Sequence, residues 1–175
     1  TNVIEGGAQE RGKRAGTENV PGIMGLAAAL KEACDHIDEN AAKVSALRDQ
    51  LIAGLSQIPH SALNSDPVHR LPGNVNFCFE GIEGESLLLL LDQAGICASS
   101  GSACTSGSLD PSHVLLAIGR PHEVAHGSLR LSLCEWNTQE DVDHILKEVP
   151  GIVAYLRSIS PVWKDLASGK KQFML

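Results

Sequence analysis

HGSLRLSLCEWNTQEDVD, the sequence of residues 126–143, places a strand pattern directly before a helix start. Apolar and polar residues alternate, which predicts a strand with one apolar and one polar face, built from Leu129, Leu131 and Leu133 against Ser128, Arg130 and Ser132. Thr138 and Asp141 then have the spacing of a capping box, which predicts a helix to Glu148. A half-buried strand followed by a capped helix indicates an α/β fold.

On either side of this stretch, the hydrophobic periodicity predicts further elements. Apolar residues spaced by three and four positions predict helices at 23–37, 44–58, 85–93, 112–118 and 152–159. Alternation of apolar and polar residues predicts strands at 75–79 and 96–98. Pro150 is expected to end one helix and start the next. The expected architecture is a small, mostly antiparallel sheet with helices packed on one face.

Composition and charge exclude several classes of function. The chain has 175 residues, of which 43% are hydrophobic and 20% are charged, so it can bury a core. A formal net charge of −7 argues against nucleic-acid binding and against a polybasic membrane anchor. No apolar run approaches the roughly 20 residues of a membrane-spanning helix. The opening residues, which lack Met and a signal peptide, are typical of the middle of a longer polypeptide.

The sequence has five cysteines, and one of them differs from the rest in its surroundings. Cys104 lies in SSGSACTSGS, residues 99–108, whose small polar residues predict a mobile loop with an accessible thiol. An incidental cysteine in a linker is the alternative. An odd count without a Cys-x-x-Cys pair favours neither disulfides nor a metal site, and is typical of the cytoplasm. The others are expected to be small buried residues, namely Cys34, Cys78, Cys97 and Cys134.

Two further features have the chemistry of an anion site. Arg130 lies on the polar face of its predicted strand, where a guanidinium can bind a carboxylate through two hydrogen bonds. A solvated or structural arginine is the alternative. GGAQERGKRAGT, residues 6–17, combines arginines and a hydroxyl with glycines, whose N–H groups can approach an anion. This loop matches neither a Walker loop nor a dinucleotide-binding fingerprint, so alone it is a weak signal.

Three stretches together resemble the cysteine desulfurases of the NifS/IscS group. They are GGAQERGKRAGTENVPGI at 6–23, SSGSACTSGSLDPSHVL at 99–115, and HGSLRLSLCEWNTQEDVD at 126–143. They follow the family's order and cover both ends of the chain. The second is the most specific, because its long Ser/Gly loop is similar to that of the members whose cysteine sits on an extended loop. The wording of this loop is closer to the NifS branch than to the IscS branch.

The resemblance implies an aspartate-aminotransferase-like enzyme of fold type I, present here as its C-terminal part. Such an enzyme uses pyridoxal 5′-phosphate (PLP) as a homodimer to convert L-cysteine to L-alanine. By resemblance, Cys104 is the nucleophile that receives the sulfur as a persulfide and carries it to an iron–sulfur scaffold or another acceptor protein. Arg130 then binds the substrate carboxylate, and Thr17 contacts the PLP phosphate of the neighbouring subunit. The resemblance assigns no role to Gln9, Arg14 or Asn19.

The chain also departs from the family. After the last predicted strand, where the family has a glycine, this chain has Cys134-Glu135. In addition, the lysine that anchors PLP in the family is expected before residue 1. The isolated chain is therefore expected neither to hold PLP nor to turn over. The expected domains are the tail of a PLP-binding domain at 1–34, a small domain with the cysteine loop at 35–160, and a C-terminal tail at 161–175.

The alternative function is a stand-alone sulfur-carrier or protein-interaction domain that a partner loads with sulfur. Residues 6–19 argue against it, because a phosphate-binding edge has no use in a carrier. The helix at 22–37 is expected to expose an apolar face that would otherwise meet the large domain. Since exposed apolar patches drive association, the isolated chain is predicted to self-associate.

Overall fold

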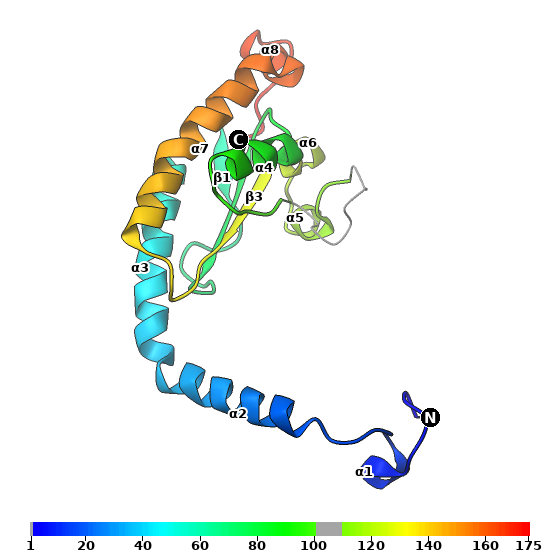
Figure 1. The fold of residues 1–175 in the computed structure, drawn as a ribbon. Coiled ribbons are helices and arrows are strands. Elements are labelled where there is room, and N and C mark those ends of the chain that lie inside the picture. The colour runs from blue at the N-terminus through cyan, green and yellow to red at the C-terminus, as the bar shows by residue number, and fades with distance from the viewer. Residues whose placement is uncertain (1, 101–109) are drawn as a thin grey trace. The chain divides into compact units, whose positions relative to one another are not determined.

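The computed structural model describes residues 2–100 and 110–175. The chain divides into two compact units, Thr1–Asp38 and Glu39–Leu175, whose helices and strands are drawn in Figure 1. The domain assignment at 1–34, 35–160 and 161–175 stays a prediction. The larger unit contains the sheet and its core, so it is the part of the chain that positions Arg130.

The smaller unit contains two helices. The short α1 (Gln9–Gly12) is followed by α2 (Val20–Asp35), which confirms the first predicted helix. α2 begins at a cap, because the Asn19 Oδ1 accepts the Gly22 N–H at 3.1 Å, and Pro21 occupies its first turn. Every residue of α2 is exposed, including its large apolar side chains Val20, Ile23, Met24, Leu26 and Leu30.

The sheet has three antiparallel strands in the order β1-β2-β3. They are β1 (Ser61–Leu63), β2 (Asn74–Phe79) and β3 (Ser128–Ser132). In the register of β2 and β3, Asn76 lies opposite Arg130, so both side chains belong to the same face of the sheet. The alternation predicted for both strands is therefore confirmed, and Arg130 lies on the polar face.

The strand predicted at 96–98 does not form. The Ile96 N–H donates to the Leu91 carbonyl at 2.8 Å, so this backbone completes the end of a helix and is not available for a ladder. Gly95, at φ 76°, makes the turn that returns the chain to that helix. The first residue of this segment to pair with the sheet is Ser99, through a single bridge to Arg130.

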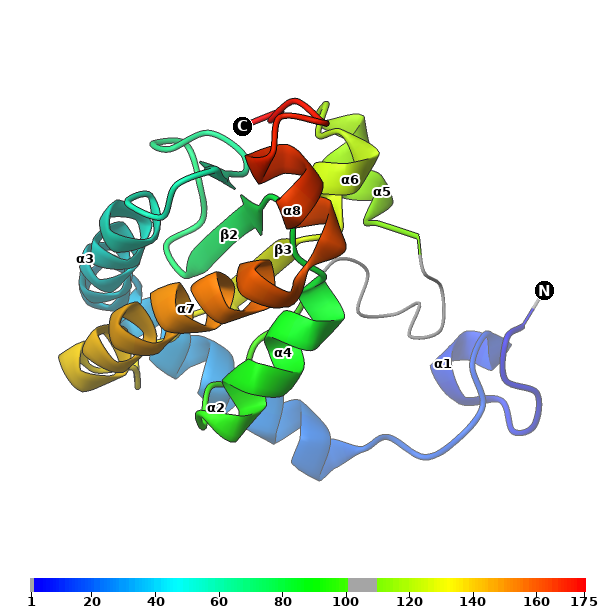
Figure 2. The same ribbon diagram turned by 90° about the horizontal axis from the view of Figure 1, so that it is seen from above.

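Three helices cover the apolar face of the sheet. They are α3 (Ile37–Leu55), α4 (Gly84–Gln93) and α7 (Gln139–Ile159). Figure 2 shows α7 beside β2 and β3 and running in roughly the same direction, with α3 and α4 on either side of it. The predicted packing of helices on one face is confirmed for these three, which are the longest of the larger unit.

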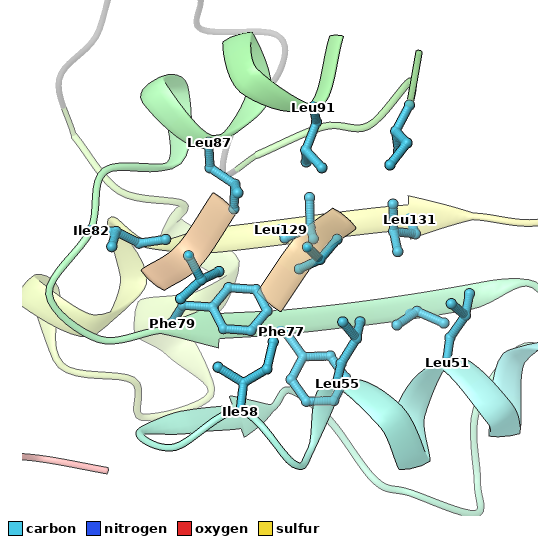
Figure 3. Packing of buried hydrophobic residues seen from close by; sticks show 14 of the residues in the cluster. Leu51, Leu55, Ile58, Phe77, Phe79, Ile82, Leu87, Leu91, Leu129 and Leu131 are labelled. Carbon is cyan, nitrogen blue, oxygen red and sulfur yellow. The ribbon is translucent and has the colours of Figure 1, made fainter. Parts of the chain in front are cut away.

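The core lies between the sheet and these helices. Phe77 and Phe79 of β2 stack with their ring centroids 6.0 Å apart. Figure 3 shows Leu55 of α3 pointing toward these rings, and Leu87 of α4 pointing toward Leu129 of β3. All five side chains are buried from solvent. Their alternation along the strands and helical spacing in α3 and α4 explain why these residues form these elements.

α7 is one continuous helix, so the break predicted at Pro150 is wrong. A proline inside a helix removes one backbone hydrogen bond. Here the penalty is offset because α7 buries one apolar stripe on both sides of Pro150, including Val142, Val149 and Val153. The capping box predicted at its start is confirmed: Thr138 and Asp141 each accept the backbone N–H of the other.

Two short helices, α5 (His113–Ala117) and α6 (His122–Ala125), lie against the opposite face of the sheet at one end. Their side chains form a second apolar cluster around Cys78 of β2, with Leu115 and Val124 buried. This end of the polar face is therefore covered, whereas Arg130 in the middle of β3 remains exposed.

The last residues pack onto the larger unit. α8 (Pro161–Ala167) follows α7, and the buried Glu80 carboxylate accepts the N–H groups of Met174 and Leu175 at 2.8 and 3.2 Å. The sequence predicts only a tail at 161–175, but this segment contains α8. The helix forms there because the Ser160 Oγ caps its start by accepting the Trp163 N–H. Among the helices of the described ranges, none has the length and apolar character needed to cross a bilayer.

Candidate functional site

Arg130 is hydrogen-bonded to the stem of the predicted cysteine loop, which is the name used for Ser99 and Ser100. Its N–H donates to the Ser99 carbonyl at 2.6 Å, and the Ser99 N–H donates to the Arg130 carbonyl at 3.0 Å. Ser99 is the second-last described residue before the gap at 101–109. The chain segment that leads to Cys104 therefore starts beside the arginine that is predicted to bind the substrate carboxylate.

A glycine lets this stem lie close to the sheet. A Cβ atom on Gly84, the first residue of α4, would meet the Ser100 Cβ at 3.0 Å and the His126 and Ser128 carbonyl oxygens at 2.9 and 3.1 Å. Any side chain here would push α4 away from either the stem or β3. The sequence pattern marked the start of this helix but carried no sign of this close approach.

The Arg130 side chain is available for a ligand. The residue is exposed, and within residues 2–100 and 110–175 no carboxylate forms an ion pair with its guanidinium. Its neighbour across the sheet is Asn76, a half-buried amide that the sequence analysis did not single out. Only the strand register, which joins residues far apart in the chain, identifies Asn76 as part of the site.

Cys104 lies outside the described residues. Of the other cysteines, Cys78 is buried as predicted, and burial raises the pKa of its thiol. The prediction was wrong for Cys34, Cys97 and Cys134, which are exposed. Cys34 is exposed with the rest of α2, Cys97 precedes the bridge without joining a ladder, and Cys134 follows the end of β3.

Cys134 belongs to the turn that differs from the family's pattern. Its N–H donates to the Asn137 Oδ1 at 2.9 Å, and the Asn137 N–H donates to the Cys134 carbonyl at 3.1 Å. These two bonds close the turn between β3 and α7 without a glycine. The departure therefore leaves the position of Arg130 in β3 intact.

Thr17 lies in the smaller unit, on the loop before α2, and is exposed. The preceding Gly16, at φ 102°, is held on both sides: its N–H donates to the Gln9 Oε1 at 3.2 Å, and its carbonyl accepts from the Arg14 Nη1 at 2.6 Å. Arg14 also donates twice to the Glu18 carboxylate, at 2.7 Å each. Gln9 and Arg14, which had no assigned role, therefore fix the backbone before Thr17.

These groups fit one edge of a phosphate site. Thr17 is exposed, and a Cβ on Gly12 would meet no atom within 4 Å, so an anion can approach the loop. The Arg14 charge is already paired with Glu18, so it offers little to a phosphate. A contact from the Thr17 hydroxyl to a PLP phosphate therefore stays a prediction, with which the exposed position of Thr17 is compatible. Among the described residues, no three His, Cys, Asp or Glu side chains gather to hold a metal ion.

Comparison with known proteins identifies relatives of the whole chain. A cysteine desulfurase IscS of Clostridium botulinum is 55% identical over 98% of this chain and 44% of its own length. A cysteine desulfurase IscS of Methanosarcina thermophila is 59% identical over 91% of this chain and 40% of its own length. A cysteine desulfurase NifS of Azotobacter vinelandii is 52% identical over 92% of this chain and 40% of its own length. The chain spans less than half the length of these curated relatives, and the identities do not favour the NifS branch.

Solved structures agree with these relatives. A NifS-like protein superposes with a TM-score of 0.76 at 37% identity, covering 89% of this chain and 39% of that one. A NifS-like protein of Rickettsia africae gives 0.77 at 33% identity, covering 88% and 40%. The predicted fold, part of a NifS-like α/β enzyme with a small antiparallel sheet, is therefore confirmed. The sequence model of the aminotransferase class-V family matches residues 6–145, and the chain belongs to this family.

Proposed function

We propose that this chain is the C-terminal part of a PLP-dependent cysteine desulfurase, which converts L-cysteine to L-alanine and leaves the sulfur on Cys104. The observation that carries the proposal is the bridge between Ser99 and Arg130. It ties the stem of the Cys104 loop to an exposed arginine that has no carboxylate partner among the described residues. The names of the relatives support the same activity.

Arg130 binds the α-carboxylate of L-cysteine. A guanidinium offers a planar fork of donors that matches a carboxylate through two parallel hydrogen bonds. Its place on β3, which is paired along its length with β2, fixes the direction from which the fork approaches the substrate. The substrate sulfur is thereby held on the side from which the loop begins.

The Cys104 thiolate attacks the sulfur of L-cysteine. A new S–S bond forms while the substrate's carbon–sulfur bond breaks, and its electron pair moves onto the carbon skeleton. Protonation of that carbon gives L-alanine, and Cys104 is left as a persulfide, so no external oxidant is required. PLP, when bound, supplies the electron sink for this chemistry. The Thr17 hydroxyl would donate a hydrogen bond to the PLP phosphate in the partner subunit. This contact requires two copies of the enzyme, which we propose to be a homodimer.

The persulfide then passes to an acceptor protein, and an iron–sulfur scaffold in the cytoplasm is the acceptor we propose. The thiolate of an acceptor cysteine attacks the outer sulfur of the Cys104 persulfide and regenerates the Cys104 thiol. The accessible loop that the sequence predicts around Cys104 suits this transfer, because the sulfur has to leave the substrate site.

The test uses the chain joined to its upstream sequence, with PLP and L-cysteine. Persulfide is detected by alkylation and mass spectrometry, and L-alanine by amino-acid analysis. Cys104→Ser should abolish both persulfide and L-alanine while PLP still binds. Cys97→Ser is the matched control, because this thiol is exposed and lies shortly before the predicted loop, and it should retain activity. Normal turnover by Cys104→Ser would show that the proposal is wrong.

A further inference from the structure

A relay of side chains crosses the polar face of the sheet beside Arg130. The Arg120 Nε donates to the Asn64 Oδ1 at 2.6 Å, and the Asn64 Nδ2 donates to the Asn76 Oδ1 at 2.6 Å. Arg120 is anchored by a second bond, from its Nη2 to the Leu63 carbonyl at 2.6 Å. Asn64 is only 2% exposed, so its amide has no bulk water with which to exchange these partners.

The chemistry of this relay fixes how each amide is turned. Arginine only donates hydrogen bonds, so the oxygen of Asn64 has to face Arg120. The nitrogen of Asn64 then faces Asn76, and the oxygen of Asn76 has to accept from it. The Asn76 Nδ2 is therefore the free end of its amide. Within the described residues no acceptor takes a hydrogen bond from this nitrogen.

The strand pairing places Asn76 directly beside Arg130. In an antiparallel strand, the N–H and C=O of one residue point to the same side, and those of Arg130 both bond to Ser99. The pair of Arg130 with Asn76 on the other side is therefore of the non-hydrogen-bonded kind. Such pairs have Cα atoms about 4.5 Å apart and side chains in closest approach. Arg130 and Asn76 thus share one face of the sheet, and no described residue accepts a hydrogen bond from the Arg130 guanidinium or the Asn76 Nδ2.

We propose that Asn76 is a second substrate-binding residue, which donates its Nδ2 N–H to the α-carboxylate that Arg130 binds. This inference rests on the proposed function and adds a residue to it. Arg130 supplies charge and Asn76 supplies direction, because the relay presents a donor and hides the amide oxygen, which would repel a carboxylate. Asn64 and Arg120 are positioning residues that keep this orientation.

The test measures the KM for L-cysteine and the inhibition constant of L-alanine in the full enzyme. L-alanine carries the carboxylate without the sulfur, so its inhibition constant reports binding alone. Asn76→Ala should raise both constants by the same factor, about 10- to 100-fold, as expected for a hydrogen bond to a charged group. The kcat should change much less. Asn76→Asp, which is nearly isosteric, should raise both constants further, because its oxygens repel the substrate.

Asn64→Asp tests the relay without touching Asn76. The new carboxylate still accepts from Arg120 but cannot donate to Asn76, so the amide of Asn76 turns its nitrogen toward that carboxylate and its oxygen toward the substrate. The L-alanine constant should rise as in Asn76→Ala. Asn74→Ala is the matched control, since Asn74 lies on the same face of β2 but opposite Ser132, and it should leave the constant unchanged.

Arg130→Ala separates this inference from the proposed function. If Arg130→Ala raises the L-alanine constant while Asn76→Ala and Asn64→Asp leave it within about twofold, the role of Asn76 is wrong and that of Arg130 stands. If Arg130→Ala also leaves it unchanged, the proposed carboxylate site itself is wrong. A change in kcat alone in Asn76→Ala would likewise overturn the inference.

Discussion

Ser99 and Arg130 exchange two backbone hydrogen bonds, so the end of one loop and the centre of one strand are held in a fixed register. Both side chains therefore lie on the same face of the sheet. The bridge is isolated and is not continued into a ladder at Ile96–Ala98, so it depends on these two bonds. A change at this bridge should therefore separate the segment that leads to Cys104 from the carboxylate site proposed at Arg130.

Ser99→Pro should uncouple them. Proline has no N–H, so the 3.0 Å bond from Ser99 to the Arg130 carbonyl is lost. We expect L-cysteine-dependent persulfide formation on Cys104 to fall by about tenfold or more, the size of effect expected when a reacting group is misplaced. PLP binding and the L-alanine inhibition constant should be retained. Both are measured in the full enzyme.

Ser99→Ala is the control for this prediction. It removes only the Oγ, whose hydrogen bond goes to the Ser100 carbonyl at 3.4 Å, and it keeps both backbone bonds to Arg130. Its rate of persulfide formation should stay close to wild type. An equal loss in both variants would mean that the hydroxyl, and not the bridge, matters.

Gly127→Ala should destabilise the larger unit strongly. A Cβ here would lie 2.0 Å from the Phe79 carbonyl oxygen, while the Phe79 N–H donates to the Gly127 carbonyl at 2.8 Å. Backbone would have to move, and we expect a loss of about 3 kcal/mol in the free energy of unfolding. Urea denaturation measures it. Gly151→Ala in α7, where a Cβ would meet nothing within 4 Å, should instead stabilise by about 1 kcal/mol.

Pro150→Ala should stabilise α7. The alanine restores the N–H that can donate to the Leu146 carbonyl, one turn earlier, and Pro150 is exposed, so its ring contributes little packing. An interior proline costs about 3 kcal/mol, and proline in the unfolded chain returns about 1 kcal/mol, so a gain of about 2 kcal/mol is expected. A lower midpoint in urea would show that the proline shapes the helix against the core.

Pro150 also shows why local rules are incomplete. The sequence pattern predicted the strand and the capping box of residues 126–143, because period and cap spacing are local properties. The same local reasoning broke α7 at Pro150, because it could not weigh one lost hydrogen bond against the buried valines on both sides. Packing across the core, which the sequence does not display, decided the outcome.

The same limit applies to the candidate site, where local patterns were predictive and non-local contacts were not. The alternating pattern predicted that Arg130 would lie on the polar face of its strand, and it does. The partners of Arg130 were not predictable, because Asn76 and Ser99 reach it from separate segments through non-local pairing. Strand register depends on how the loops close, so an alternating pattern gives the face of a residue but not its neighbours.

α2 provides a prediction about the chain of residues 1–175 on its own. Leu26 and Leu30 are 70% and 60% exposed and lie one turn apart. We expect this chain to self-associate in sedimentation velocity at high concentration, because exposed apolar surface drives association. Leu26→Glu should shift it toward monomer, whereas Ala28→Glu, which adds the same charge on another side of α2, should do so less. A clean monomer in the wild-type chain would contradict the prediction.

The capping box of α7 should give a pH-dependent contribution to stability. The Thr138 N–H donates to the Asp141 Oδ2 at 2.9 Å and, with a further bond from the Asn137 Nδ2, holds the pKa of the Asp141 carboxyl below its usual range. A group whose pKa is lowered by folding stabilises the folded state above its unfolded pKa of about 4. That stability is lost as the pH falls through the folded pKa.

Asp141→Asn should therefore lower the Tm at pH 7, and the difference from wild type should shrink as the pH falls below about 4. Thermal unfolding followed by circular dichroism over this range measures it. Thr138→Ala is the control, because the Thr138 Oγ1 accepts the Asp141 N–H and does not titrate, so its penalty should persist in acid. If the Asp141→Asn difference stayed constant well below the ordinary carboxyl pKa of about 4, the hydrogen bonds would act through the neutral carboxyl as well. The charge of Asp141 would then contribute nothing to the cap.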